Sequence, residues 1–175
     1  RLTKVKKLHI LLSAINLINE ESPKVNLIII GDGPERDNLE NIGKAGLENK
    51  WLHFTGACYD EEGLGRYLSM SDLCVSPGNV GLTAIHSLSF GTPVGTHDNM
   101  SNQMPEAGAI QDGYNGFFFK ENDTDDLRNQ IENWINTKDR ETVRKNSYEI
   151  IDKYYNPFYQ LKVIKRLVYD EKPEI

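Results

Sequence analysis

A loop with two glycines that runs directly into a helix is the strongest candidate for binding chemistry in this sequence. Its residues are Gly78, Asn79, Val80 and Gly81, and the helix opens with Leu82 and Thr83. Glycine lets a backbone approach a ligand closely, and the first N–H groups of a helix lack intrahelical partners and carry partial positive charge. We therefore expect an anion here, with phosphate as the natural guest and the Thr83 hydroxyl as an added donor. An ordinary strand-to-helix turn is the alternative.

Four cations gather at the start of the first predicted helix, and they are Arg1, Lys4, Lys6 and Lys7. Cations at a helix N-terminus oppose the helix dipole, which is locally unfavourable. A bound phosphate would compensate for this repulsion, so the cluster is a second candidate for anion binding. A solvated basic face is the alternative.

Other polar side chains are suited to contact a sugar. His86 follows Leu82 by one helical turn, where its ring can hydrogen-bond a sugar hydroxyl, and a structural histidine is the alternative. A loop after a predicted strand contains side chains of the kind that bind polyols, although loops are commonly polar: Asp98, Asn99, Asn102 and Gln103. Gly31 and Gly33 follow an apolar strand as in a dinucleotide loop, but the third glycine is lacking, which argues against a nicotinamide site.

Alternating helices and short strands must position these residues. Strands are predicted over 25–30, 51–55, 72–76, 93–96 and 117–119, and helices over about 6–21, 35–46, 60–70, 82–90, 105–110, 123–136, 139–154 and 157–170. This order predicts an α/β fold, a Rossmann-like three-layer α/β/α sandwich with a parallel sheet. Ligands of such sheets bind beyond the carboxyl ends of the strands, so the loops 31–34, 56–59 and 77–81 should form the site.

Length and composition exclude several classes of protein. The 175 residues suit one domain, which we expect to span residues 1–175. Acidic residues outnumber basic ones by 26 to 20, a net charge of −6, which disfavours non-specific binding to nucleic acid or a membrane surface. No apolar stretch approaches the ~20 residues that span a bilayer. The spacing of residues suggests no metal site, and Cys58 and Cys74 are expected to be core thiols in a reducing compartment.

Short motifs occur in a fixed order over about residues 1–136. They are Arg1-Leu2 followed by Lys6, Gly31-Asp32-Gly33-Pro34-Glu35-Arg36, Phe54-Thr55-Gly56, Tyr67-Leu68 with Ser71-Asp72, Gly81-Leu82, Gly91-Thr92-Pro93-Val94, Pro105-Glu106, and Asp112-Gly113-x-Asn115-Gly116. Together they resemble the carboxy-terminal, nucleotide-sugar-binding domain of family-4, group 1 glycosyltransferases, which are retaining enzymes with the GT-B fold. Each motif alone is weak evidence, but together they occur in the order that the family has, which makes the resemblance specific.

The resemblance implies that the chain forms one half of a GT-B fold. It also implies an enzyme that transfers a sugar from a nucleotide diphosphate sugar to a glycan or lipid acceptor without a metal or other cofactor. The family's catalytic Arg and Lys, which neutralise the diphosphate leaving group, correspond to Arg1 and Lys6. The donor-binding positions that the resemblance implies are Gly33 and Ala57 for the base, Gly78, Asn79, Val80, Gly81, Leu82 and Thr83 for the phosphates and sugar, and His86 for the ribose.

The resemblance also implies a partner domain. The acceptor would bind mostly to an amino-terminal half, which we expect to be absent because the sequence begins at Arg1 rather than at methionine. The isolated domain should then bind nucleotide without turnover. A cytoplasmic location, at most peripheral to the inner face of a membrane, and a role in bacterial polysaccharide or lipid-linked glycan assembly are further expectations.

The chain departs from the family at two positions. Many members carry two glutamates eight residues apart, one contacting the donor sugar and one the ribose, and these align with Gly78 and His86. Asn79 is a candidate to replace part of the missing carboxylate, and neutral histidine can hydrogen-bond ribose hydroxyls. Two other functions stay open: a non-catalytic binding or regulatory domain of a degenerate transferase, and a UDP-sugar 2-epimerase, for which no paired acid and base groups are apparent.

Overall fold

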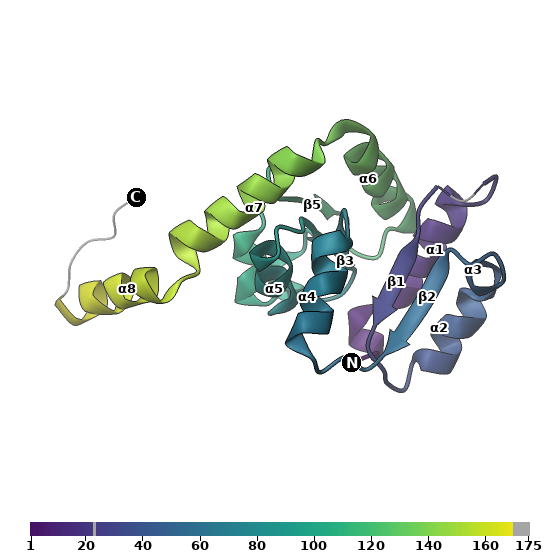
Figure 1. The fold of residues 1–175 in the computed structure, drawn as a ribbon, viewed down its shortest axis with the longest axis horizontal. Coiled ribbons are helices and arrows are strands. Elements are labelled where there is room, and N and C mark those ends of the chain that lie inside the picture. The colour runs from purple at the N-terminus through teal and green to yellow at the C-terminus, as the bar shows by residue number, and fades with distance from the viewer. Residues whose placement is uncertain (23, 170–175) are drawn as a thin grey trace.

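Helices alternate with short strands along the chain, as the sequence predicts (Figure 1). The structure is a computed structural model that describes residues 1–22 and 24–169. The strands are β1 (Leu27–Ile30), β2 (Leu52–Gly56), β3 (Cys74–Ser76), β4 (Val94–His97) and β5 (Gly116–Phe119). The α-helices are α1 (Leu8–Ile18), α2 (Arg36–Ile42), α3 (Lys44–Glu48), α4 (Glu61–Met70), α5 (Thr83–Ser89), α6 (Thr124–Thr137), α7 (Arg140–Tyr154) and α8 (Pro157–Tyr169). Short 3-10 helices are η1 (Lys4–Lys6), η2 (Met100–Asn102) and η3 (Pro105–Ala109).

The strands are parallel, but they form two hydrogen-bonded groups where the sequence predicts one sheet. β1 pairs with β2, and β3, β4 and β5 pair in that order. β4 has a strand on either side and is buried at all four residues, whereas Leu27, Ile28 and Ile30 of β1 are only half-buried. β1 is less covered because, among the described residues, only one of its edges pairs with another strand.

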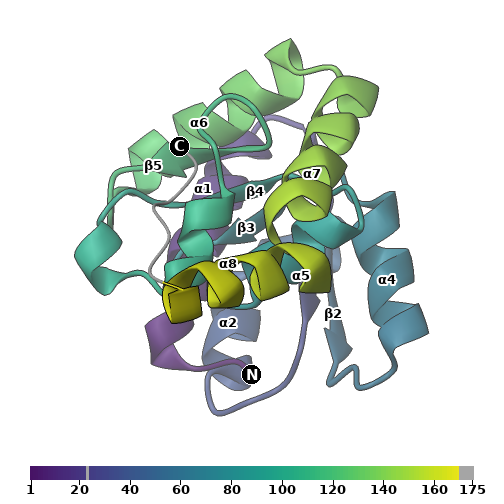
Figure 2. The same cartoon turned by 90° about the vertical axis from the view of Figure 1, so that its left-hand side faces the viewer.

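The predicted three-layer arrangement is confirmed by how side chains of β5 divide between two apolar clusters. Phe117 and Phe119 belong to a core cluster that includes α1 and α6, whereas Phe118 packs on a second cluster that includes α5, η3 and Val94. Successive side chains of a strand point to opposite faces of the sheet, so these two clusters lie on opposite faces. Figure 2 shows α1 on one side of β3 and β4, and α5 on the other. The carboxyl ends of the strands are thus held between two packed layers of helices.

The first predicted helix, over 6–21, is divided at Lys7. The 3-10 helix η1 ends at Lys6 and α1 begins at Leu8, with Lys7 between them at φ 50° and ψ 30°. This left-handed backbone cannot continue a right-handed helix, so the chain changes direction here. The buried residues of α1 are Ile10, Leu11, Leu12, Ala14, Ile15 and Ile18.

Two other predicted helices differ in form. The helix expected over 35–46 is two helices, α2 and α3, which meet at Gly43. A Cβ atom at Gly43 would lie 2.3 Å from Cδ2 of Leu52, so the Leu52 side chain packs closely against this corner. The helix expected over 105–110 is the 3-10 helix η3, and the loop 97–103 contains the 3-10 turn η2.

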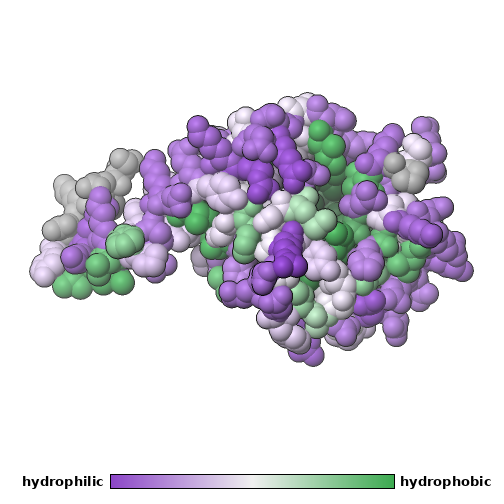
Figure 3. Space-filling view, in the orientation of Figure 1, coloured by the Kyte–Doolittle hydropathy of each residue, from purple (hydrophilic) through white to green (hydrophobic). Residues whose placement is uncertain are grey.

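The last helix extends away from the rest of the molecule (Figure 1). The prediction of a helix over 157–170 is confirmed for Pro157–Tyr169, and residue 170 lies outside the described residues. None of the described residues of α8 is buried, and Phe158 and Leu167 are 85% and 77% exposed. Figure 3 shows hydrophobic surface on this protruding part of the molecule.

Candidate functional site

The amino-terminal segment lies against the loop 31–34, which follows β1. The N–H of Leu2 donates a hydrogen bond of 2.9 Å to the carbonyl of Asp32. A Cβ atom on Gly33 would lie 2.3 Å from the carbonyl oxygen of Leu2, so this close approach of two backbones requires glycine. Arg1 is exposed, and its backbone nitrogen lies beside the same loop. The segment therefore starts next to one of the three loops that the sequence singled out.

Lys6 joins the same segment to the loop 77–81. Its carbonyl accepts a 3.1 Å hydrogen bond from the Gly78 N–H, and its Nζ donates to the backbone carbonyl (2.8 Å) and side-chain Oδ1 (3.0 Å) of Asn79. A Cβ atom on Gly78 would lie 2.0 Å from the carbonyl oxygen of Val5, so glycine is required for η1 to pack on this loop. Partial burial lowers the pKa of Lys6. The structure thus brings a half-buried cation to the predicted anion-binding loop.

The end of this loop presents two exposed side chains at the start of α5. Gly81 has φ 51°, a left-handed conformation that favours glycine. Val80 before it is fully buried, and its N–H donates 2.9 Å to Oε1 of Gln103. Leu82 and Thr83 after it are exposed. The turn is anchored on its inner side, and its outer side is open to a ligand.

His86 is exposed on α5, one turn after Leu82. Positions four apart share one face of a helix, so the ring lies on the same side as the exposed Leu82. His86 is therefore not buried in the core, and its contact with a ribose stays a prediction.

The two loops predicted to hold a base are joined at the ends of β1 and β2. The N–H of Gly31 donates 2.8 Å to the carbonyl of Gly56, which has φ 76°. Ala57 follows Gly56 and is exposed. The loop containing Gly33 and the loop containing Ala57 therefore begin next to each other.

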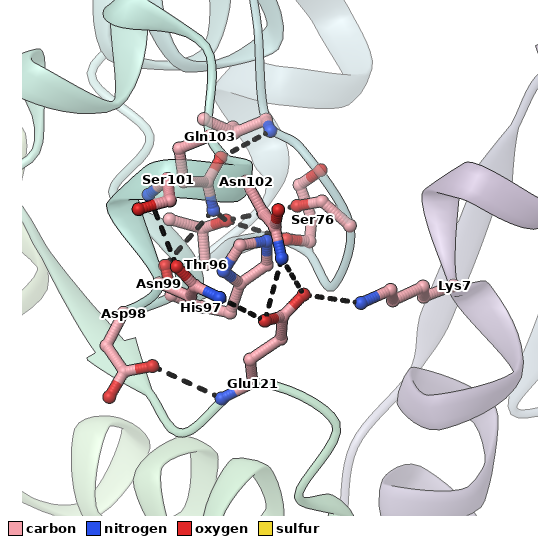
Figure 4. A network of polar contacts seen from close by, with 12 residues as sticks. Lys7, Ser76, Thr96, His97, Asp98, Asn99, Ser101, Asn102, Gln103 and Glu121 are labelled. Carbon is pink, nitrogen blue, oxygen red and sulfur yellow. Dashed lines mark hydrogen bonds and ion pairs between the residues drawn. The ribbon is translucent and has the colours of Figure 1, made fainter.

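Glu121, which the sequence analysis did not single out, is the centre of a polar network beside Lys7 (Figure 4). Its Oε1 accepts 2.7 Å from Nζ of Lys7, and its Oε2 accepts 2.6 Å from Nδ2 of Asn99. Nδ2 of Asn102 lies 3.1 Å from both carboxylate oxygens. Hydrogen bonds from Lys7, and then from the two asparagines, lower the pKa of Glu121 from its ordinary 4.5 to about 2. The carboxylate is therefore held ionised and nearly fully bonded by protein groups.

The polar loop 97–103 uses its amides internally, which favours the structural alternative over polyol recognition. Asn99 and Asn102 bond Glu121, as described above. Nε2 of Gln103 donates 2.8 Å to Oγ1 of Thr96 and 3.1 Å to the carbonyl of His97. Asp98 is exposed, and its Oδ1 accepts 3.2 Å from the Glu121 N–H. These side chains fasten the loops after β4 and β5 to each other and to Val80.

His97 lies under this network and is 1% exposed. Its Nδ1 is buried and has no hydrogen-bond partner among the described residues. Burial lowers the pKa of His97, which favours the neutral ring.

The described residues contain no group of His, Cys, Asp and Glu side chains that could hold a metal ion. Within residues 1–22 and 24–169, every helix is too short or too polar to cross a bilayer.

The sequence of this chain is similar to those of known proteins. Residues 1–150 match the model of a family described as "Glycosyl transferases group 1". The sulfoquinovosyl transferase SQD2 of Arabidopsis thaliana is 26% identical over 149 residues, which are 82% of this chain and 28% of that protein.

Two solved structures illustrate the shared fold. The pneumococcal O-GlcNAc transferase GtfA in complex with UDP and GlcNAc has a TM-score of 0.76 at 21% identity, over 98% of this chain and 34% of that one. The C-terminal domain of the group 1 glycosyl transferase family protein LpcC from Francisella tularensis has a TM-score of 0.74 at 20% identity, over 90% of this chain and 83% of that one. The chain thus spans 28% of the plant relative and 34% of the pneumococcal chain, and most of an isolated C-terminal domain.

Proposed function

Because the chain belongs to the glycosyl transferases group 1 family, we propose that it is the donor-binding half of a retaining, metal-independent GT-B glycosyltransferase. Residues 1–175 form a single domain that binds a nucleotide diphosphate sugar, and a glycan or lipid acceptor binds mostly to an amino-terminal half. The contact of Lys6 with Asn79 carries this proposal, because it unites a cation with a glycine-bearing loop at the start of a helix. Both features favour an anion at the same place.

The donor would lie across the loops at the carboxyl ends of the strands. Its diphosphate is assigned to the backbone of Gly81, Leu82 and Thr83, and its base to the neighbouring loops at Gly33 and Ala57. The ribose is assigned to His86, whose exposed ring lies on the same helix face as Leu82. The sugar is assigned to the part of the loop formed by Gly78, Asn79 and Val80. Complexes with UDP among the structural neighbours support a uracil nucleotide as the first candidate.

Arg1 and Lys6 act on the leaving group in this proposal. Transfer breaks the bond between the anomeric carbon and a diphosphate oxygen and forms a bond from that carbon to an acceptor oxygen, with retained configuration. Negative charge grows on the diphosphate as its bond breaks. Cations fixed beside that charge stabilise the transition state more than the ground state, which is how they accelerate the reaction.

A non-catalytic nucleotide-sugar-binding domain is the second candidate, and Gly78 is the observation that favours it. The carboxylate that contacts the donor sugar in many family members aligns with this position. A side chain here would collide with the Val5 carbonyl, because a Cβ atom would lie only 2.0 Å from it. Asn79 then has to supply the polar contact to the sugar, or the sugar is held without turnover.

A thermal-shift panel with UDP, GDP and ADP tests donor binding directly on this chain. A ligand present at 100 times its dissociation constant should add about 2.7 kcal/mol to the free energy of unfolding. We expect one of the three nucleotides, UDP first, to raise the melting temperature. Equal melting temperatures with and without all three nucleotides at millimolar concentration would contradict the proposal.

Turnover separates the two candidate functions. A longer protein that contains this chain and an amino-terminal half should transfer sugar to an acceptor or release UDP from the donor if it is an enzyme. Binding of the donor with neither reaction would support the non-catalytic domain. We expect the 175-residue chain alone to bind without transfer.

A further inference from the structure

Lys7 occupies a backbone conformation that is costly for any residue with a side chain. It has φ 50° and ψ 30° and links η1 to α1. Glycine adopts this left-handed region freely, whereas a Cβ atom there crowds the backbone. Residues held in such conformations persist where the surrounding structure fixes them. The Lys7 side chain therefore calls for a contact that offsets this cost.

The Lys7 side chain makes one such contact, the ion pair with Glu121. Nζ and Oε1 are 2.7 Å apart, and the two side chains are only 25% and 14% exposed. Asn99 and Asn102 complete the bonding of the carboxylate, so Glu121 is fixed from the side of β4 (Figure 4). A charge-assisted hydrogen bond to a pre-oriented acceptor is stronger than an exposed surface pair.

The turn at Lys7 sends two neighbouring lysines to two different loops. Lys6 reaches Asn79 in the loop after β3, and Lys7 reaches Glu121 in the loop after β5. η1 is therefore held on both sides of β4. If the contact of Lys6 with Asn79 or that of Lys7 with Glu121 is lost, only one of these two contacts still holds η1.

We propose that Glu121 and Lys7 are a positioning pair that holds η1, and with it Lys6, on the loop 77–81 of the donor site. This inference rests on the proposed function for its effect on nucleotide binding. Neither residue is assigned a contact with the nucleotide. The charge of Lys7 is neutralised by its ion pair with Glu121, whereas Lys6 bonds neutral oxygens of Asn79 and can pair with an anionic ligand.

Calorimetric titration with UDP distinguishes positioning from simple electrostatics. Both Glu121→Gln and Lys7→Met should weaken UDP binding by between about twofold and about 100-fold, the range of coupled contacts. The double variant should bind no more weakly than the weaker single variant, because both changes break one anchor. Lys7→Arg keeps the ion pair and should bind within about twofold of the unmodified chain. Lys120→Met, which removes an exposed neighbouring cation paired with Asp123, is the matched control and should not change affinity.

Electrostatics alone predicts the opposite result for one variant. Removing the Glu121 charge would leave Lys7 as a free cation near the site, so UDP would bind more tightly to Glu121→Gln. Unchanged or tighter binding by that variant, in a chain with an unchanged far-UV spectrum, overturns the proposal.

Amide hydrogen exchange tests the pair without any nucleotide. The Gly78 N–H bonds the carbonyl of Lys6, so Glu121→Gln should speed its exchange on the order of tenfold while the Val94 N–H in β4 is unaffected. Equal rates at Gly78 in the variant and the unmodified chain would contradict positioning even if no nucleotide bound. Faster exchange at Gly78 without UDP binding by the unmodified chain would support the anchor and count against the proposed function alone.

Discussion

Lys6 is the single residue most closely tied to the candidate site. Replacing it with methionine keeps most of its length and removes the charge and the bonds to Asn79. We expect UDP affinity to fall by about 1.5–3 kcal/mol, the range for hydrogen bonds to charged groups. Isothermal titration calorimetry measures this, with Lys44→Met on the exposed surface of α3 as the control. Equal affinities for Lys6→Met and Lys44→Met would mean that the cation is only part of a solvated face.

The pH dependence of binding gives an independent test of the Lys6 charge. Burial lowers its pKa, so its neutral form appears at lower pH than in an ordinary lysine. UDP affinity should therefore fall as pH rises into the alkaline range. Lys6→Arg stays charged throughout and should show a flatter profile in the same titrations.

Packing against η1 requires glycine at position 78. Gly78→Ala would place a Cβ atom 2.0 Å from the Val5 carbonyl and 2.8 Å from Cα of Lys6. Because backbone atoms cannot rotate away, η1 must shift, and we expect a loss of about 1–3 kcal/mol in urea unfolding together with weaker UDP binding. Gly108→Ala is the matched control, since among the described residues its new Cβ atom would meet only the Tyr155 hydroxyl, at 3.9 Å. Similar unfolding curves for the two variants would refute the packing argument.

Glu121 should leave a signature in the pH dependence of stability. Its pKa is lowered to about 2 in the folded chain from an ordinary 4.5, so the folded state favours the charged carboxylate. This contribution is fully present above pH 4.5 and is lost as pH falls toward 2. The difference in melting temperature between the unmodified chain and Glu121→Gln should therefore shrink over that interval. Other carboxylates titrate in both proteins, and a difference that stays constant with pH would contradict the assignment.

Among the elements, the two groups of strands should differ in protection from solvent. The N–H of Leu27 donates to the carbonyl of Trp51, just before β2, and the N–H of Gly31 donates to the carbonyl of Gly56, at the end of β2. In a parallel pair alternate amides point to opposite edges, so those of Ile28 and Ile30 point to the edge where no described strand pairs with β1. We expect these two amides to exchange on the order of tenfold faster than the other two by NMR. Uniform slow exchange along β1 would show that this edge is covered.

Element type was predictable from the sequence wherever apolar spacing was strong. The buried face of α1 follows from a period near 3.6, and β1 follows from the continuous apolar run Leu27–Ile30. The points at which two of the predicted helices are interrupted could not be predicted from this spacing. α2 ends at Gly43, where Leu52 packs closely, and Lys7 interrupts the first helix although lysine is a good helix former. Both depend on contacts that are distant in sequence.

For the whole molecule, the difference between local patterns and contacts distant in sequence explains which parts of the site the sequence could predict. Lys6, Gly78 and Gly81 belong to short motifs whose spacing carries information, and the structure joins Lys6 to the loop of both glycines. Glu121 is one acidic residue in a polar turn and lies 114 positions from its partner Lys7. No local pattern could single it out. Only the packing of α1 against α6 and of β5 against β4 brings the two residues together.

The whole molecule also divides into a core that stabilises the fold and a terminal helix that does not. In α6, Leu127 is fully buried, so Leu127→Ala should lower the free energy of unfolding by about 2–5 kcal/mol. Phe158 and Leu167 of α8 are 85% and 77% exposed, so changing both to serine removes almost no burial. Substitutions at exposed positions stay within about 0.5 kcal/mol each, and urea unfolding should show that small effect. A loss comparable to that of Leu127→Ala would mean that the apolar side chains of α8 are covered in solution. The physical basis of the expectation is that stability follows the apolar area removed from water, and α8 removes little.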